Sequence, residues 1–421
     1  MVAMTMALLG GVGQAQPIFD YVSRPEDAYG WAKTDQTRLA SGAIVTHLEL
    51  TSQVWRGLTW QHRLQLIEPA AMRYPRTALL LITGGSLNSS EISQLATAAD
   101  MLSAPVVILG DIPNQPLYDG LSEDALIAFT FQNCLESGDP TWPLLFPMTK
   151  AAIKAMDAVE AYTQNEWQVG VDSFFVTGAS KRGWTTWFVA CVAPSRIKGI
   201  APMVYDNLNL AAQMPHQLAA WGDYSEQIDD YTELGLPDML TSKEGQALAA
   251  MVDPYTYRSR ATMPKLIISG TNDRYWPVDA ANLYFADLPE PRYLLYVPNC
   301  GHGLADLARV MMAQTGFFAA CTGRAKLPKL RWESVEGRHL KLQVSSDLAP
   351  LQVRQWTASA PTRDFREARW SSSDLRPHNG TFTGRVRYPD KGYSAIFAEA
   401  VYAIEGRPMP LSTGVAVVGP R

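Results

Sequence analysis

One serine has the local sequence of a catalytic nucleophile. Ser180 lies in VTGASKRGW, where an apolar run ends in Gly178 and Ala179 and a helical pattern begins directly after the serine. Small neighbours let a chain turn sharply from strand to helix, which presents the hydroxyl above the sheet edge at a helix N-terminus. The spacing is G-x-S-x-x-G, because Arg182 stands where a second glycine is usual and Gly183 follows. We therefore predict a nucleophilic serine; the alternative is a serine that only caps the helix.

A nucleophilic serine needs a base, and the base needs an acid that orients it. Of the six histidines, only His302 follows a late apolar run, in YVPNCGHGLAD. The preceding run, in KLIISGTNDRYWP, places Asp273 just past its end. The chain order Ser, Asp, His would bring all three side chains to one edge of an α/β sheet. Asp206 and Asp279 are competing acids, and Asp279 is better suited to capping the next helix.

The negative charge that forms on the attacked carbonyl also needs hydrogen-bond donors. We expect one from the backbone N–H of Lys181, and a second from Gly85 or Ser86 in the sequence TGGS at 83–86. Lys181 and Arg182 are two cations in the first turn of a helix, where the helix dipole disfavours positive charge. Their position predicts an anion beside them, either on the substrate or on the protein itself; the alternative is that they face solvent or pair with an acid in the same helical turn.

The elements that must position these residues have the pattern of a mostly parallel sheet. Residues 43–69 alternate as a β-hairpin does, with Gly57 near its turn. After that, short apolar runs that suit strands buried on both faces alternate with helical stretches. This order predicts a doubly wound α/β-hydrolase domain over residues 17–325. The apolar runs lie at 77–85, 105–111, 173–180, 197–205, 265–270 and 292–298.

Two segments depart from this alternation. Residues 206–262 are longer than one crossover helix and rich in aromatic residues, including Trp221 and Tyr224. We interpret them as a helical lid whose aromatic side chains contact the substrate; the alternative is an ordinary packing extension. Residues 326–421 contain about seven short alternating runs, which predict a small β-sandwich domain that packs on the rest or binds a partner.

Composition and cysteine spacing exclude several classes of protein. The 421 residues are 47% hydrophobic with a net charge of −5, so no basic excess favours nucleic acid. The sequence has neither a C-x-x-C pair nor an H-E-x-x-H motif, so we expect no metal and no cofactor. Cys191 suits a buried thiol, whereas a disulfide through Cys300 or Cys321 stays an alternative and the pairing among them and Cys134 is undetermined.

The N-terminus predicts export. Residues 1–16 contain a short apolar stretch followed by small residues, as a signal peptide does, although a basic beginning is missing. The alternative is an apolar N-terminus on a cytoplasmic protein. No later run of 18 or more apolar residues occurs, so we expect a periplasmic or secreted protein without stable membrane insertion.

Several motifs resemble those of the PhoPQ-activated pathogenicity-related proteins, over most of the chain after about residue 20. The resemblance implies an exported α/β hydrolase with a β-rich C-terminal extension, and it supports Ser180, Asp273 and His302 as the triad. It implies no particular substrate. The motifs are TGGS at 83–86, TGASKRGWTTW at 177–187, VYDNLNL at 204–210, WGDY at 221–224, PKLIISGTNDRYW at 264–276, NCGHG at 299–303 and DFREARW at 364–370.

Together these observations predict a serine hydrolase that cleaves an ester or amide bond in a small molecule or peptide. A carboxylesterase and a peptidase both fit. The alternative from another class is a secreted, non-catalytic interaction or signalling protein on a hydrolase scaffold, with a protein partner bound through residues 326–421.

Overall fold

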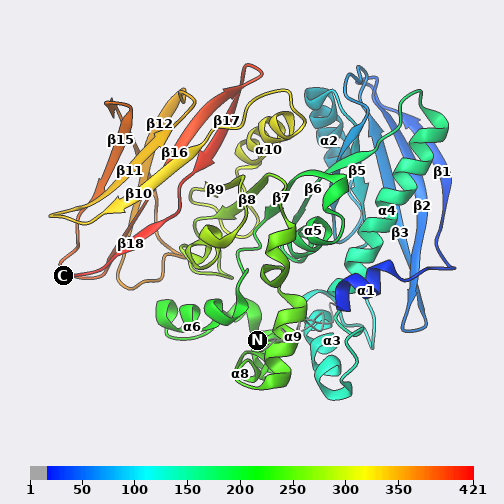
Figure 1. Ribbon diagram of the computed structural model, residues 1–421, viewed down its shortest axis with the longest axis horizontal. Helices are drawn as coiled ribbons and strands as arrows, with labels where there is room; N and C mark the ends of the chain where they lie inside the picture. The colour runs from blue at the N-terminus through cyan, green and yellow to red at the C-terminus, as the bar shows by residue number, and fades with distance from the viewer. Residues whose placement is uncertain (1–16) are drawn as a thin grey trace, which may run out of the picture.

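The structure is a computed structural model that describes residues 17–421. The predicted signal peptide at 1–16 therefore lies outside the described residues. Figure 1 shows one long twisted sheet with helices on both faces and the C-terminal strands at one end. Among residues 17–421, no helix combines the length and the apolar character needed to cross a bilayer.

Each predicted apolar run forms a strand of the central parallel sheet. These strands lie in the order β5-β4-β6-β7-β8-β9 and all pair in parallel. Their residues are almost all buried because helices cover both faces, which is why the runs are continuously apolar rather than alternating. The predicted mixed α/β class is confirmed. The strands are β4 (Thr77–Ile82), β5 (Val106–Leu109), β6 (Ser173–Ala179), β7 (Ile197–Met203), β8 (Lys265–Gly270) and β9 (Arg292–Val297).

Three antiparallel strands extend this sheet at the N-terminal end: β1 (Gly30–Arg38), β2 (Ile44–Trp55) and β3 (Leu58–Glu68). The β2–β3 hairpin turns through Arg56 and Gly57, with φ of 52° and 76°. Two positive φ angles match the right-handed twist of the flanking strands, and the predicted Gly57 supplies one of them without steric cost. β3 then pairs antiparallel with β5.

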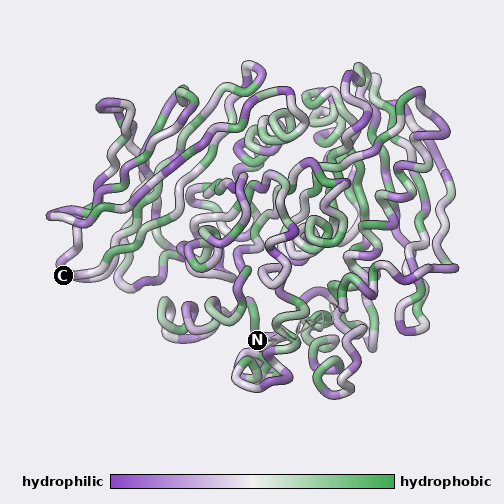
Figure 2. The backbone as a smooth tube through the Cα atoms, in the orientation of Figure 1, coloured by the Kyte–Doolittle hydropathy of each residue, from purple (hydrophilic) through white to green (hydrophobic). Residues whose placement is uncertain are grey.

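Helices cover the two faces with separate apolar layers. On one face α4 and α5 pack on the sheet, with α1 against α4; on the other face α10 packs beside α2. The central strands and α5 are mostly hydrophobic in Figure 2, whereas the outer turns are mostly hydrophilic. The helices outside residues 206–262 are α1 (Pro17–Ser23), α2 (Ser89–Leu102), α3 (Glu123–Ser137), α4 (Leu145–Glu166), α5 (Lys181–Val192) and α10 (Leu307–Cys321).

The segment between β7 and β8 is helical. We call residues 206–262 the insertion. It contains α6 (Leu210–Trp221), α7 (Asp229–Thr232), α8 (Leu236–Met239) and α9 (Lys243–Val252), together with short 3-10 turns. In Figure 1 α6, α8 and α9 gather on the same side of the sheet as α3.

The C-terminal segment forms two sheets that pack on each other, but one of them is the continuation of the central sheet. β17 pairs with β9 through Ser412 and Leu294, so the large sheet has 14 strands. The sequence predicted a separate module beginning at 326 and did not indicate this continuity. The large sheet takes β12 (Gln352–Ala360), β13 (Ser371–Asp374), β16 (Tyr393–Ile404), β17 (Arg407–Ser412) and β18 (Ala416–Val418); the small sheet has β10 (Leu330–Val335), β11 (Leu340–Ser346), β14 (Pro377–His378) and β15 (Thr381–Val386).

The apolar core also runs across the predicted boundary. Met409 and Leu411 of β17 are fully buried in the same apolar cluster as Leu295 of β9 and Phe317 of α10. Helix α10 approaches β17 so closely that a Cβ on Gly316 would lie 2.8 Å from the Cβ of Met409. Residues 326–421 therefore complete the core of the preceding domain.

This shared core predicts that a C-terminal substitution destabilises the whole chain. Met409→Ala should lower the free energy of unfolding by about 2–5 kcal/mol, because it leaves a cavity in a close-packed region. Thermal unfolding followed by circular dichroism should show one transition at lower temperature. The control is Leu351→Ala, which removes a side chain that is 66% exposed and should change stability little. A separate early transition, with the main transition unchanged, would show that the C-terminal segment folds on its own.

Candidate active site

Ser180 occupies a sharp turn between β6 and α5. Its backbone has φ 56° and ψ −123°, a conformation that few non-glycine residues adopt. The two flanking glycines are required by close contacts. A Cβ on Gly178 would lie 2.7 Å from the carbonyl oxygen of Arg182, and one on Gly183 would lie 2.9 Å from that of Met203. The G-x-S-x-x-G spacing thus serves the packing of the turn against its own helix and against β7.

Asp273 and His302 are in direct contact. His302 Nδ1 lies 2.9 Å from Asp273 Oδ2 and 3.1 Å from Oδ1. Asp273 is buried, and its Oδ1 also accepts a hydrogen bond from the Tyr275 backbone N–H at 2.9 Å. The loops that carry the pair abut, because a Cβ on Gly270 would lie 2.3 Å from the carbonyl oxygen of Cys300. A carboxylate on Nδ1 leaves Nε2 as the nitrogen that can accept a proton.

Ser180 and His302 line the same cavity, which has a volume of about 110 Å³. His302 Nε2 is buried and has no hydrogen-bond partner within residues 17–421. In the described residues, then, no hydrogen bond joins it to the Ser180 hydroxyl; such bonds are often long in enzymes without substrate. The structure places the predicted nucleophile and the predicted base on the wall of one cavity, with the predicted acid in contact with the base.

Sequence analysis did not identify Tyr275 as a residue of the site. Its ring lies over the imidazole of His302, with ring centroids 4.1 Å apart and planes 31° apart. Burial raises the pKa of Tyr275 to about 12, so its hydroxyl keeps its proton at neutral pH. The only feature of the sequence that could have indicated a role for Tyr275 at the site is its position two residues after Asp273.

The two cations after Ser180 bind protein carboxylates. Lys181 Nζ lies 2.6 Å from Asp124 Oδ2, and Arg182 binds both oxygens of Glu123 at 2.6 and 2.8 Å. Both acids begin α3, and Arg182, Lys181 and a hydrogen bond from Gln115 lower the pKa of Glu123 to about 2 against the opposing effect of burial. The sequence predicted an anion either on the substrate or on the protein. The structure shows protein anions, Glu123 and Asp124.

The TGGS loop lies against Arg182. A Cβ on Gly84 would lie 2.1 Å from the guanidinium Nη2, so a larger residue there would require the Arg182 side chain to shift. Thr83 Oγ1 donates to the carbonyl oxygen of Gly85 at 2.7 Å and holds the loop. Among the described residues, Lys181 lines the cavity whereas Gly85 and Ser86 do not.

Trp221 and Tyr224 do not belong to the cavity wall within the described part of the chain. The Trp221 ring instead lies 4.2 Å from the guanidinium carbon of Arg366, and Tyr224 packs beside Trp276. The chain just after β7 supplies Tyr205 to the wall, and the insertion supplies the polar Asn207 and the aromatic Tyr231. Aromatic content alone could not separate these from the residues that face elsewhere.

The two competing acids have other partners. Asp206 is buried and accepts a hydrogen bond from the Tyr284 hydroxyl; burial raises its pKa to about 7. Asp279 does not cap the following turn as expected, because its carboxylate is 2.8 Å from His216 Nε2 and also binds Arg363. It therefore joins the insertion to the C-terminal segment.

A C-terminal loop supports the two loops that carry Asp273 and His302. The Asn272 side-chain amide lies 2.7 to 3.2 Å from the carbonyl oxygens of Phe365, Arg366 and Ala368. On the neighbouring loop, Asn299 and Trp370 exchange two side chain–backbone hydrogen bonds of 2.7 and 3.0 Å. The DFREARW motif at 364–370 thus has a structural role beside the site.

All four cysteines are free thiols. Cys134, Cys191 and Cys300 are buried, and burial raises the pKa of Cys191 to about 12. The open alternative of a disulfide through Cys300 or Cys321 is not realised in this structure. Within residues 17–421, no group of three or more His, Cys, Asp or Glu residues is arranged to hold a metal ion.

Comparison with solved structures defines the class of fold. The acetyl xylan esterase from Paenibacillus sp. R4 is similar with a TM-score of 0.50 and 15% identity, over 71% of this chain and 91% of the esterase. The acetyl xylan esterase 1 from Thermoanaerobacterium sp. JW/SL YS485 has a TM-score of 0.48 and 16% identity, over 71% and 93%. The central sheet, the elbow at Ser180 and the first of these similarities define an α/β-hydrolase fold.

Comparison of sequences then gives the family. Residues 18–366 match the family described as PhoPQ-activated pathogenicity-related protein. The autocrine proliferation repressor protein A of Dictyostelium discoideum is 33% identical over 92% of this chain and 86% of its own length. The chain belongs to the PhoPQ-activated pathogenicity-related family, as its motifs indicated.

The buried acid Asp206 generates a prediction about pH. Its pKa is about 7 in the folded protein and near 3.8 when unfolded, so the folded state holds an extra proton between these values. The contribution of this proton to the free energy of unfolding is complete below pH 3.8 and is lost as the pH rises through 7. Asp206→Asn cannot lose that proton, so its free energy of unfolding should rise relative to wild type from pH 4 to pH 7 and then level off.

Denaturant unfolding of both proteins across this range would measure the difference. A direct comparison is needed because His62, whose pKa burial lowers to about 4, changes stability in the opposite direction. The exposed Asp223→Asn is the control. A difference between Asp206→Asn and wild type that does not vary with pH would contradict the prediction.

Proposed function

We propose that this protein is a serine hydrolase that cleaves an ester or amide bond through Ser180, His302 and Asp273. One observation carries the proposal: the strained elbow serine and the buried Nε2 of His302, which has no partner within residues 17–421, lie on the wall of one cavity, while a buried carboxylate holds Nδ1. Strained backbone and unpartnered buried nitrogens are costly and are typical of functional sites.

The chemistry follows from this geometry. Ser180 Oγ attacks the carbonyl carbon and gives its proton to His302 Nε2, and Asp273 stabilises the resulting imidazolium. The oxyanion lies at the N-terminus of α5, where we assign the Lys181 N–H as one donor and a Gly85 or Ser86 N–H as the other. His302 then protonates the leaving group, and water releases the acyl group by the reverse sequence of proton transfers.

Further parts of the proposal rest on the same site. The insertion would act as a lid, since its helices supply much of the cavity wall. Export through residues 1–16 to the periplasm or medium also belongs to the proposal, as does a protein partner for exposed parts of residues 326–421. Carboxylesterase and peptidase activities both fit the triad.

A second candidate is a non-catalytic interaction or signalling protein on a hydrolase scaffold. It is favoured by the name of the Dictyostelium relative, which describes repression of proliferation and no catalysis. Against it, a protein that only binds partners has no need for the Asp273–His302 pair beside the strained Ser180.

Reaction with a fluorophosphonate probe distinguishes the two candidates. Wild-type protein should be labelled on Ser180, because the probe reacts with a serine that a base activates. Ser180→Ala should not be labelled, and its thermal midpoint should stay within a few degrees of wild type. Intact-protein and peptide mass spectrometry would measure the extent and the site of labelling.

Ser23→Ala, which removes an exposed hydroxyl, serves as the control and should be labelled like wild type. Wild-type protein that stays unlabelled while folded would favour the non-catalytic candidate. A large drop in the thermal midpoint of Ser180→Ala would instead indicate a mainly structural serine.

A further inference from the structure

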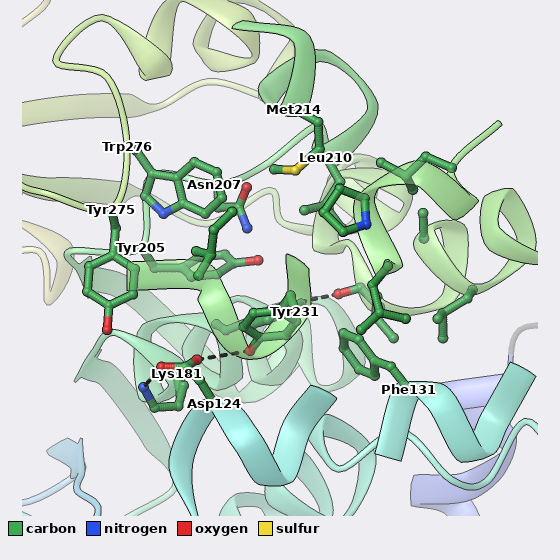
Figure 3. A pocket seen from close by; sticks show the side chains of 18 of the residues that line it. Asp124, Phe131, Lys181, Tyr205, Asn207, Leu210, Met214, Tyr231, Tyr275 and Trp276 are labelled. Atoms are coloured by element: carbon green, nitrogen blue, oxygen red, sulfur yellow. Dashed lines mark hydrogen bonds and ion pairs between the residues drawn. The ribbon is translucent and has the colours of Figure 1, made fainter. Parts of the chain in front are cut away.

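The cavity beside Ser180 is mostly apolar, and the insertion supplies much of its wall. Helix α3 and the insertion supply aliphatic and aromatic side chains, and these lie around an open centre in Figure 3. A volume of about 110 Å³ is somewhat smaller than the cavity of about 150 Å³ that holds a benzene molecule elsewhere, so the cavity has room for at most about six carbon atoms. The apolar wall includes Phe131, Trp184, Met214, Leu236, Leu248 and Val252.

The charged groups at the cavity neutralise each other. Asp124 and Lys181 both line it and form an ion pair of 2.6 Å. Lys181 also lies 3.3 Å from Glu123, which binds Arg182, and the Tyr231 hydroxyl donates to Asp124 at 2.9 Å. The charges of these two cations and two anions cancel, so no unpaired charge is available to bind a charged ligand. Burying another charge here would be costly.

Besides His302 Nε2, two buried polar atoms at the cavity lack partners within residues 17–421. Tyr205 Oη and Asn207 Oδ1 belong to side chains that are 5% and 6% exposed, and neither atom has a hydrogen-bond partner among the described residues. Figure 3 shows both side chains reaching the open centre. A buried hydroxyl without a partner costs free energy, so a ligand atom that accepts its hydrogen bond would relieve this cost.

The position of His302 decides which half of a substrate enters the cavity, the acyl group or the leaving group. The leaving group must lie near His302, because the imidazolium protonates it. His302 is stacked with Tyr275, and Figure 3 places Tyr275 and Phe131 on opposite sides of the cavity. The part lined by Phe131 and Trp184 therefore receives the other half, the acyl group.

We infer that this cavity binds an uncharged acyl group of up to about six carbons that carries a hydrogen-bond acceptor for the Tyr205 hydroxyl. The inference rests on the proposed function and names its substrate class. In the first step Ser180 Oγ bonds to the acyl carbon, the carbon–oxygen bond of the ester breaks, and the alcohol leaves with the proton from His302. Water then takes the place of Ser180, and the free acid leaves.

Four 4-nitrophenyl esters test the inference: acetate, hexanoate, 5-oxohexanoate and hydrogen adipate. The last three have equal carbon counts and differ in their far end, which is apolar, an uncharged acceptor or a carboxylate. We expect kcat/KM for hexanoate to exceed that for acetate at least about 10-fold, because each buried methylene adds to binding. The 5-oxohexanoate should be at least as good as hexanoate, and adipate no better than acetate.

Variants tie the selectivity to this cavity. Leu248→Trp should fill the cavity and bring the hexanoate-to-acetate ratio of kcat/KM close to one. Ala249→Leu adds a smaller side chain to the cavity and should lower the same ratio. Leu218→Trp is the control, since Leu218 is 40% exposed on α6 and should leave the ratio unchanged. Tyr205→Phe should lower kcat/KM for 5-oxohexanoate relative to hexanoate.

The outcomes separate this inference from the function on which it rests. Labelling of Ser180 by the fluorophosphonate, combined with equal or better use of acetate or adipate, would overturn the inference alone. So would labelling without turnover of any of the four esters, or a hexanoate preference that both filling variants leave intact. Absence of labelling would overturn the proposed function itself.

Discussion

The ion pairs at the start of α5 are the constraint on which the site depends. Lys181 and Arg182 follow the serine directly, in a helical turn where the dipole disfavours cations, and both are buried. Their burial is tolerable because Glu123 and Asp124 neutralise them at hydrogen-bonding distance. The same contacts join the elbow to α3, fix the loop after β4 against the Arg182 guanidinium, and reach the insertion through Tyr231. One charge cluster thereby sets the positions of the serine, the adjacent loop and a wall of the cavity.

The other half of the site depends on the C-terminal segment. Asp273 and His302 lie on loops after the last two parallel strands, and such loops are mobile unless other elements hold them. Here the 361–370 loop provides that support through Asn272 and Asn299. The segment that provides it continues the central sheet and shares its core, so Asp273 and His302 are positioned by residues far along the chain. The family match, which ends at residue 366, extends into this loop.

The fold, the family and the cavity differ in how much they say about function. The α/β-hydrolase fold is compatible with many chemistries, and the name of the Dictyostelium relative describes a biological effect and no reaction. The site is more informative because its charges are balanced, its wall is apolar and its polar atoms without partners are few. If the protein is the hydrolase proposed above, these properties favour uncharged substrates over the acidic ones that Lys181 and Arg182 would suit if their charges were free.

The sequence by itself determined the features that depend on neighbouring residues: the six buried runs, the glycines of the elbow, the hairpin turn and the order of Ser180, Asp273 and His302. These follow from local sterics and from burial, which leave a periodic pattern in the chain. Only the tertiary structure decided which partners the polar residues take. Lys181 meets Asp124, 57 residues away, Asp279 binds Arg363 instead of capping a turn, and β17 joins β9. A polar side chain can pair with many others, and the pairing that forms depends on how distant elements pack, which no local pattern records.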